Sequence, residues 1–277
     1  MSTAASTAAS TAILALALAG CTVDRPAAAP EPGTTSATGE GSFVPVYEPA
    51  LTEDTTTEAQ LLRSGRVLER FSGTMNRLVT VPGEVRVTAK ECGEDNAFFD
   101  PETHSIELCY ELVGSERALF TSSGDASADN GTDDTDGTDR KLLASALATL
   151  YHEAGHALIW ELDLPVTGRE EDVADQFAAY MLTTDAGSSE DLVTVAETYA
   201  LTSAENTGLE DLAFHDSHPL DEQRSVNFLC YAYGAYPHHY RHLVDSGDLP
   251  AERAEECEAE YAQLAGAWDS LLADHAA

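Results

Sequence analysis

Residues 151–162, YHEAGHALIWEL, place two histidines and a glutamate within five positions of an otherwise apolar run. Such a run packs into a core, where a polar side chain without a partner costs on the order of a few kcal/mol. On a helix, positions four apart share one face, so His152 and His156 can direct their ring nitrogens at one ion. Glu153 is rotated by about 100° from His152 and can lie beside that ion without binding it.

This HExxH spacing is the arrangement in which a zinc-bound water can lose a proton to a carboxylate. Zn²⁺ is therefore the expected cofactor, His152 and His156 are candidate ligands, and Glu153 is the candidate catalytic base. The alternative is a pair of histidines that are satisfied by hydrogen bonds within the core.

A catalytic zinc ion keeps three protein ligands and one open position, so a third ligand is needed. Glu171 and Asp175 again lie four positions apart, in a second predicted helix. Glu171 can complete the metal site, and Asp175 can accept the second N–H of a zinc-binding histidine. Glu170 and Asp172 are adjacent alternatives that we expect to point elsewhere, as acidic residues that favour a helix N-terminus.

Hydrophobic periodicity predicts an α+β fold in one domain spanning residues 58–277. A helix is expected from Glu58 to about Leu78, and alternation around 85–90 and 106–110 predicts a small antiparallel sheet. The C-terminal part is mostly helical. Its predicted helices lie near residues 141–162, 171–184, 188–202, 220–234 and 250–273.

Two segments have compositions that cannot bury enough apolar surface to order themselves. Residues 21–57 are rich in Pro, Ala, Thr, Ser, Gly and Glu, which predicts a flexible tether. Residues 122–139 contain six aspartates and no basic residue, which predicts an acidic disordered loop. The run DNGTDDTDG in this loop lacks the closing glutamate of an EF-hand, so calcium binding is the minor alternative there.

The chain carries 49 acidic and 14 basic residues, for a formal net charge of -35. Such a surface argues against nucleic acid and anionic lipid as partners. It is typical of a highly soluble exterior, and attraction of cationic substrates or divalent ions is the alternative interpretation. We expect a monomer.

The N-terminal segment Leu18-Ala19-Gly20-Cys21 follows an apolar stretch that is too short to span a bilayer. It resembles the lipobox of bacterial lipoproteins, although no Lys or Arg precedes Arg25. The resemblance implies that residues 1–20 are a signal peptide and that Cys21 carries lipid. The protein would then be secreted or tethered outside the cytoplasmic membrane, with the lipid as its only membrane contact.

Four further cysteines, an even number, are expected of an exported chain with two disulfides. Three pairings are possible, and we favour the sequence-local one because each pair falls within one predicted structural unit. A thiolate zinc site is the rival interpretation, but no CxxC spacing supports it. The predicted pairs are Cys92 with Cys109 and Cys230 with Cys257.

HEAGH followed by an ExxAD helix resembles the gluzincin metallopeptidases, the group that contains thermolysin and the CaaX-type endopeptidases. The resemblance implies a zincin-like fold, zinc bound by the two histidines and Glu171, and Glu153 as the base. Asn96-Ala97-Phe98 resembles the edge strand that lies along bound peptide in these enzymes, so Asn96 and Ala97 are candidate substrate-binding residues.

Ser217-His218-Pro219 with Arg224 resembles the His-Pro…Arg segment of the CaaX-type group. This likeness makes His218 the first candidate to stabilise a developing oxyanion, with His215 and Tyr231 behind it. A contact that caps the following helix is the alternative role for His218. His238, His239 and His242 are spaced for a second metal, but no carboxylate joins them, and a solvated cluster is the favoured interpretation.

An ordered series of segments over most of residues 60–275 resembles a family of secreted bacterial metallopeptidases catalogued as a domain of unknown function. The resemblance implies a gluzincin fold and settles no substrate. We predict a zinc-dependent endopeptidase that acts on peptides or proteins outside the cytoplasmic membrane. The alternative is a non-catalytic metal-binding or scaffold lipoprotein that keeps the zincin fold. The segments are CGEDNAFFDP, ELCYEL, HEAGHALI, LPVTGREEDVADQFA, HPLDEQRSVNFLCYAYG and LPAERAEECEAEY.

Overall fold

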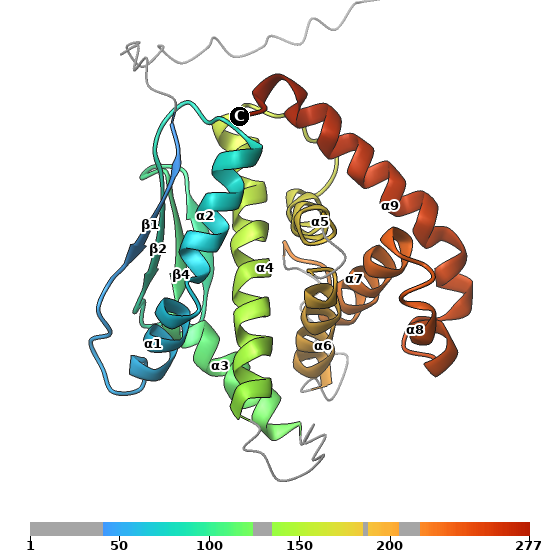
Figure 1. The fold of residues 1–277 in the computed structure, drawn as a ribbon, viewed down its shortest axis with the longest axis horizontal. Coiled ribbons are helices and arrows are strands. Elements are labelled where there is room, and N and C mark those ends of the chain that lie inside the picture. The colour runs from blue at the N-terminus through green and yellow to red at the C-terminus, as the bar shows by residue number, and fades with distance from the viewer. Residues whose placement is uncertain (1–40, 124–134, 185–187, 205–216) are drawn as a thin grey trace, which may run out of the picture. The chain divides into compact units, whose positions relative to one another are not determined.

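The structure, a computed structural model, describes residues 41–123, 135–184, 188–204 and 217–277. The predicted signal peptide, Cys21, part of the predicted tether and acidic loop, and His215 lie outside the described residues. The described chain is α+β and mostly helical, with one four-stranded sheet among its described residues (Figure 1).

The sheet has the strand order β1-β2-β4-β3, which places β3 at one edge. Strands β1, β2 and β4 run parallel to one another, and β3 runs antiparallel to its neighbour β4. The predicted antiparallel sheet is therefore wrong in direction, because alternating burial marks a strand but carries no information about its orientation. The strands are β1 (Phe43–Tyr47), β2 (Val85–Lys90), β3 (Ala97–Asp100) and β4 (Ser105–Cys109).

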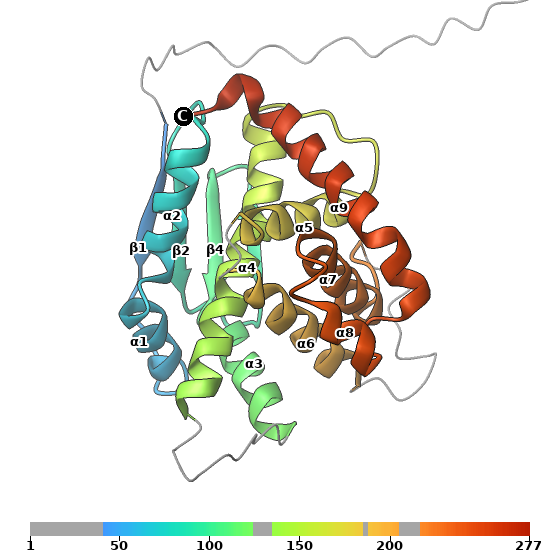
Figure 2. The same ribbon diagram turned by 45° about the vertical axis from the view of Figure 1, so that its right-hand side comes forward.

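A long central helix, α4 (Thr135–Glu161), packs against the sheet on one side and against the C-terminal helices on the other (Figures 1 and 2). α1 (Thr56–Ser64), α2 (Val67–Leu78) and α3 (Tyr110–Ser122) also contact it. The remaining helices are α5 (Glu170–Leu182), α6 (Glu190–Ala204), α7 (Asp221–Ala235), α8 (Arg241–Ser246), α9 (Ala251–Leu272) and the 3₁₀ turn at Ala273–His275.

The predicted helix over residues 58–78 is two helices, which meet at Gly65 and Arg66. A Cβ on Gly65 would lie 2.5 Å from a methyl carbon of Leu143 on α4, so a larger residue here would require the Leu143 side chain to move. Arg66 has a φ of 52°, in the left-handed region that ends a helix. The sequence interpretation overlooked this glycine signal, and it also missed α3 and α8.

Strand β1 lies within the segment for which composition predicts a tether, so the ordered domain begins before residue 58. The Phe43 ring packs edge-on against Phe71 of α2, with ring centroids 5.8 Å apart. Asn76 fixes the same residue, because its side chain accepts from the Phe43 N–H at 2.7 Å and donates to its carbonyl at 3.0 Å. A strand of five residues is hidden when composition is averaged over a long polar segment.

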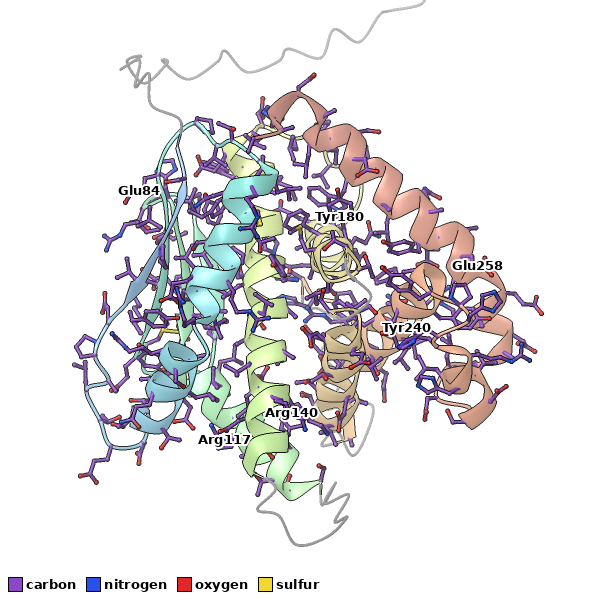
Figure 3. The ribbon with its side chains drawn as sticks, in the orientation of Figure 1. Glu84, Arg117, Arg140, Tyr180, Tyr240 and Glu258 are labelled. Atoms are coloured by element: carbon purple, nitrogen blue, oxygen red, sulfur yellow. A yellow bond between two sulfur atoms is a disulfide. The ribbon has the colours of Figure 1, made fainter. Side chains whose placement is uncertain are left out.

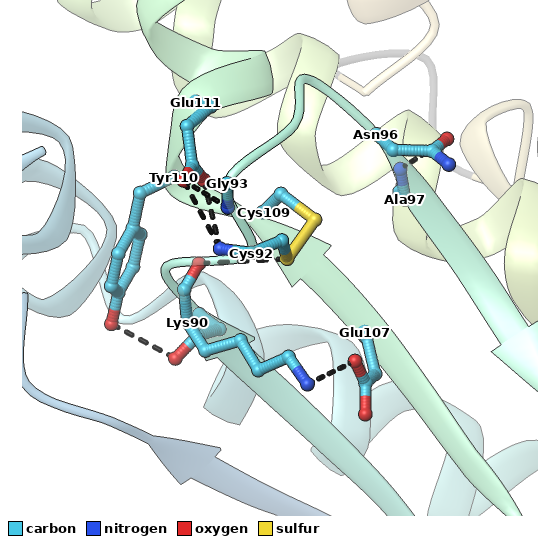
Figure 4. Close-up of a disulfide and its surroundings, with 10 residues drawn as sticks. Lys90, Cys92, Gly93, Asn96, Ala97, Glu107, Cys109, Tyr110 and Glu111 are labelled. Atoms are coloured by element: carbon cyan, nitrogen blue, oxygen red, sulfur yellow. Dashed lines mark hydrogen bonds and ion pairs between the residues drawn. A yellow bond between two sulfur atoms is a disulfide. The ribbon is translucent and has the colours of Figure 1, made fainter.

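Both predicted disulfides are confirmed: Cys92 pairs with Cys109, and Cys230 pairs with Cys257. The first links the segment after β2 to the end of β4 (Figure 4). Beside it, the Glu111 carboxylate accepts hydrogen bonds from the backbone N–H groups of Cys92 and Gly93. The second joins α7 to α9. Within the described ranges, no helix combines the length and apolar character needed to span a bilayer.

Helices α4 and α5 cross with almost no space between their backbones at Gly155. A Cβ at this position would lie 2.8 Å from the Cα of Ala174 and 3.3 Å from the Cβ of Phe177. Since the nearest atom belongs to the backbone of α5, a side chain here can be accommodated only if the helices move apart.

Glu116 of α3 is a carboxylate inside the domain, with only 7% of its surface exposed. It accepts a hydrogen bond from the Ser145 hydroxyl of α4 at 2.7 Å. Burial raises the pKa of Glu116 to about 7, and the Ser145 bond offsets only part of that effect. Its neighbour Arg117 forms ion pairs with Glu58 and Asp139 and so joins α3 to α1 and α4 (Figure 3).

We expect Gly155→Ala to lower the free energy of unfolding by about 1–3 kcal/mol, because the added methyl group forces α4 and α5 apart. Gly266→Ala is the matched control, since nothing lies within 4 Å of that site on α9. Helix propensity predicts a gain of up to about 1 kcal/mol for the control. Urea denaturation of the three proteins checks this, and equal midpoints for Gly155→Ala and wild type would contradict the close crossing.

We expect Glu116→Gln to gain stability relative to wild type as the pH rises from 5 to 8. In the unfolded chain the carboxyl ionises near about pH 4.3, whereas in the folded chain it ionises near 7. Wild type therefore loses up to about 3 kcal/mol over this interval, and the amide does not. The measurement is urea denaturation at several pH values. Glu258→Gln, at an exposed position on α9 (Figure 3), is the control, and a pH-independent gain would contradict the assignment.

Candidate metal centre

The stretch YHEAGHALIWE, residues 151–161, forms the C-terminal part of α4, where His152 and Glu153 are held in the interior. His152 and Glu153 are each 7% exposed, and His156 is half-buried. Their apolar neighbours Ala154, Ala157 and Leu158 are fully buried, which fixes the helix in place and orients the polar residues.

Helix α5 brings Glu171 to the two histidines. The Nε2 atoms of His152 and His156 are 3.3 Å apart, and each lies 3.3 Å from Oε2 of Glu171. Tetrahedral coordination with bonds of about 2.0–2.1 Å separates ligand atoms by about 3.3–3.4 Å. The three atoms therefore form a triangle of the size that one zinc ion needs.

The Glu171 oxygen in this triangle is buried, and it has no hydrogen bond of normal geometry within the part of the chain that the structure describes. Leaving a buried carboxylate oxygen in this state is costly unless something else satisfies it. A divalent cation among the imidazole nitrogens would do so, so the donor set fits a metal.

His152 is oriented from behind by an acidic residue, as predicted. Its Nδ1 lies 2.8 Å from Oδ1 of Asp175, which leaves Nε2 directed at Glu171. Arg224 of α7 donates two hydrogen bonds to Asp175, at 2.9 and 2.6 Å, and its guanidinium lies over the Tyr199 ring. The sequence interpretation gave Arg224 no role, because its partner lies 49 residues away in the chain.

Glu170 does not point elsewhere, as the sequence interpretation expected. Its Oε1 lies 2.7 Å from Nδ1 of His156, so it orients the second histidine as Asp175 orients the first. Glu170 is the first residue of α5, where the side chain can reach back past the helix end, and a strict count of helical faces misses this.

His218 closes the remaining side of the cluster from the loop before α7. Its Nε2 lies 2.9 Å from Oε2 of Glu171, and its ring stacks on His152 with centroids 6.0 Å apart. Arg169 donates a hydrogen bond to the Ser217 carbonyl and so ties this loop to the start of α5. His152, Glu171 and His218 also form a group whose ligand atoms lie within 4.8 Å of one another.

The electrostatics favour positive charge between these groups. Burial opposes protonation of His152, yet the neighbouring carboxylates of Asp175 and Glu171 raise its pKa to about 9. Burial alone would raise the pKa of Glu171, but the imidazoles of His152, His156 and His218 around its carboxylate lower it well below its ordinary value. Protons on the imidazoles and a metal cation would therefore compete for the same place.

Glu153 faces the space beside the cluster. Burial raises the pKa of its carboxyl, and the positive charges of His152 and His156 lower it in part. The backbone N–H of Phe99, on strand β3, donates a hydrogen bond to it. A carboxylate with a raised pKa is suited to accept and return a proton.

Asn96 and Ala97 lie at the start of β3, and both line a cavity of 670 Å³ together with His152, Glu153 and His218. Asn96 accepts a hydrogen bond from the Ala97 N–H at 2.9 Å. Trp160, which is 59% exposed, lines the same cavity, and sequence reasoning did not single it out.

Among the described residues, the other histidine and tyrosine candidates are not part of the cluster. Tyr231 is buried, and its hydroxyl is hydrogen-bonded to Gln176. His238, His239 and His242 are exposed and form no group with metal-ligand spacing within the described residues, as the solvated-cluster interpretation predicts.

Comparison with known proteins gives one match. The model of a family described as "Putative metallopeptidase" matches residues 47–272, which include every element from α1 to α9. Searches of curated proteins and of solved structures found no match. The description implies a hydrolase that uses a metal and acts on peptides or proteins. The chain, whose described residues bring metal-ligating side chains together between α4 and α5, belongs to this metallopeptidase family.

Proposed function

We propose that the protein is a zinc-dependent endopeptidase with a zincin-like, gluzincin-type site. The observation that carries the proposal is the triangle of His152, His156 and Glu171, with all three edges at 3.3 Å. Family membership supports peptide hydrolysis with a metal, and the triangle supports zinc as that metal.

His152, His156 and Glu171 would hold the ion, and His218 lies beside them. The alternative triad replaces His156 with His218. We prefer the first set because two helices fix its members and their separations are equal. The His218 side chain is 44% exposed and comes from a loop, which suits a residue that must share the site with substrate.

When bound, zinc acidifies a water molecule and polarises the peptide carbonyl. Glu153 accepts a proton from the attacking water and passes it to the nitrogen of the departing amine. His218 donates a hydrogen bond to the carbonyl oxygen as negative charge develops there. Asp175 and Glu170 hold the rings of His152 and His156 in orientation.

The substrate would lie along the edge strand β3. An extended peptide can pair with an open sheet edge through main-chain hydrogen bonds, and β3 is an edge strand beside Glu153. Asn96 and Ala97 are the proposed contacts at its start. Trp160 adds an apolar surface at the rim of the same cavity.

We further propose that the protein acts outside the cytoplasmic membrane. Two disulfides support an oxidising compartment, since such bonds are rare in the cytosol. Attachment through a lipid on Cys21 remains a prediction from the lipobox resemblance.

We expect wild type to bind one zinc ion per chain and to hydrolyse casein or a quenched fluorescent peptide pool. Glu153→Gln should keep the zinc and lose about 10²–10⁴-fold in kcat, because the proton acceptor is removed and the ligands are not. Metal analysis and kinetics on the same samples check this, with Glu258→Gln as the control. Zinc in every protein with activity in none would support a non-catalytic metal-binding or scaffold lipoprotein.

The two histidines assigned different roles should respond differently. His156→Gln should lose zinc, because it removes one corner of the triangle. His218→Gln should retain zinc and lose about 10²–10³-fold in kcat, the usual cost of a missing oxyanion donor. Zinc stoichiometry, with kcat and KM measured separately, distinguishes them. Zinc lost from His218→Gln and kept by His156→Gln would assign the alternative triad.

A further inference from the structure

A second cavity, of 690 Å³, adjoins the candidate metal centre on the side of α3 and α6. His152, Glu153 and His218 line one end of it. The rest of its lining comes from α3, α4, α5, α6 and α7 and from the residues at the start of β3. A peptide lying across the metal centre could therefore place one side chain in this cavity.

Much of the cavity wall is apolar, with Leu112 and Leu119 of α3, Val195 of α6 and Phe228 of α7. Glu116 and its hydrogen-bond partner Ser145 interrupt this wall. An apolar channel that contains a carboxylate matches a side chain with an aliphatic stem and a cationic end.

The carboxylate of Glu116 has no cationic partner among the described residues, and Ser145 is its hydrogen-bond partner there. Arg224, the arginine in the cavity lining, is already engaged by Asp175 through two hydrogen bonds. Asp95 and Asp221 add further negative charge to the lining. The cavity therefore offers an uncompensated acidic group beside apolar walls.

The distance along α4 fits a long side chain. Ser145 and His152 are seven residues apart on one helix, which corresponds to about 10 Å at 1.5 Å per residue. One extended residue spans about 3.4 Å, and an extended lysine side chain reaches about 6 Å from Cα to Nζ. Because the side chain stands roughly perpendicular to the extended backbone, the two together cover about 7 Å, and an ammonium–carboxylate contact spans about 3 Å more. A lysine next to the bond at the metal centre can thus bring its ammonium group near Glu116.

We propose that this cavity selects a basic side chain of the substrate, lysine or arginine, and that Glu116 determines this specificity by binding its cationic group. The inference rests on the proposed peptidase function and names its substrate class. The raised pKa of Glu116 agrees with a carboxylate that lacks a cation in the free protein. A bound ammonium or guanidinium group would favour its charged form.

The test compares peptides that differ by one charge. A library of eight-residue peptides carries lysine, arginine, norleucine or glutamate at one position at a time, and kcat/KM of wild type is measured at pH 8. We expect one position near the cleaved bond to favour lysine or arginine over norleucine by at least tenfold. Glu116→Gln should abolish this preference, and Glu258→Gln should preserve it. A wild type that cleaves without basic preference overturns the inference and leaves the peptidase function intact.

A binding measurement separates the two proposals. Zinc-loaded Glu153→Gln is titrated with the lysine and norleucine peptides by calorimetry, which requires no turnover. We expect the lysine peptide to bind ten times more tightly than the norleucine peptide, and the double variant Glu116→Gln, Glu153→Gln to lose this difference. That result supports the cavity assignment even if wild type cleaves nothing. Equal binding of both peptides overturns it. The comparison of peptides on the single variant tests the assignment even if the double variant fails to fold.

Discussion

The close crossing of α4 and α5 is the constraint on which the candidate site depends. Gly155 lies between His152 and His156, and its missing side chain lets the backbone of α5 approach at Ala174. That approach brings Glu171, three residues before Ala174, to both histidines, and Asp175, the residue after Ala174, to His152. If α4 and α5 lay farther apart, both the ligand triangle and the hydrogen bond that orients His152 would be lost. The contact at Gly155 therefore determines the packing of the two helices and the geometry of the metal site.

A relay of charges connects this crossing to α7. Arg224 binds Asp175, Asp175 binds His152, and His152 faces Glu171. Each of these side chains is mostly buried, and burying its charge alone would cost free energy. Each charge is compensated by the next one in the series, which ends at Glu171 Oε2. The series thus ends at an unsatisfied carboxylate oxygen, at the point where a cation is proposed.

Local patterns predicted the parts of the structure that local physics determines. The helix face that carries His152 and His156, the pairing of Glu171 with them, and the two sequence-local disulfides follow from periodicity and spacing. Strand direction, the break at Gly65 and the partner of Arg224 depend on contacts between distant segments, which no local pattern encodes. Glu170 was misjudged because helix ends do not follow the regular face rule.

One stripe of α4 serves both the metal centre and the neighbouring cavity. Ser145, Thr149 and His152 line that cavity at steps of four and three residues, and His156 continues the stripe into the ligand triangle. Because a helix is rigid over this length, the backbone of α4 fixes the separation between Ser145, which donates a hydrogen bond to Glu116, and the histidine ligands. The same helix would therefore set both the place where a substrate side chain is recognised and the place where the bond is cleaved. A substrate whose charged group reaches Glu116 would place its backbone at Glu153.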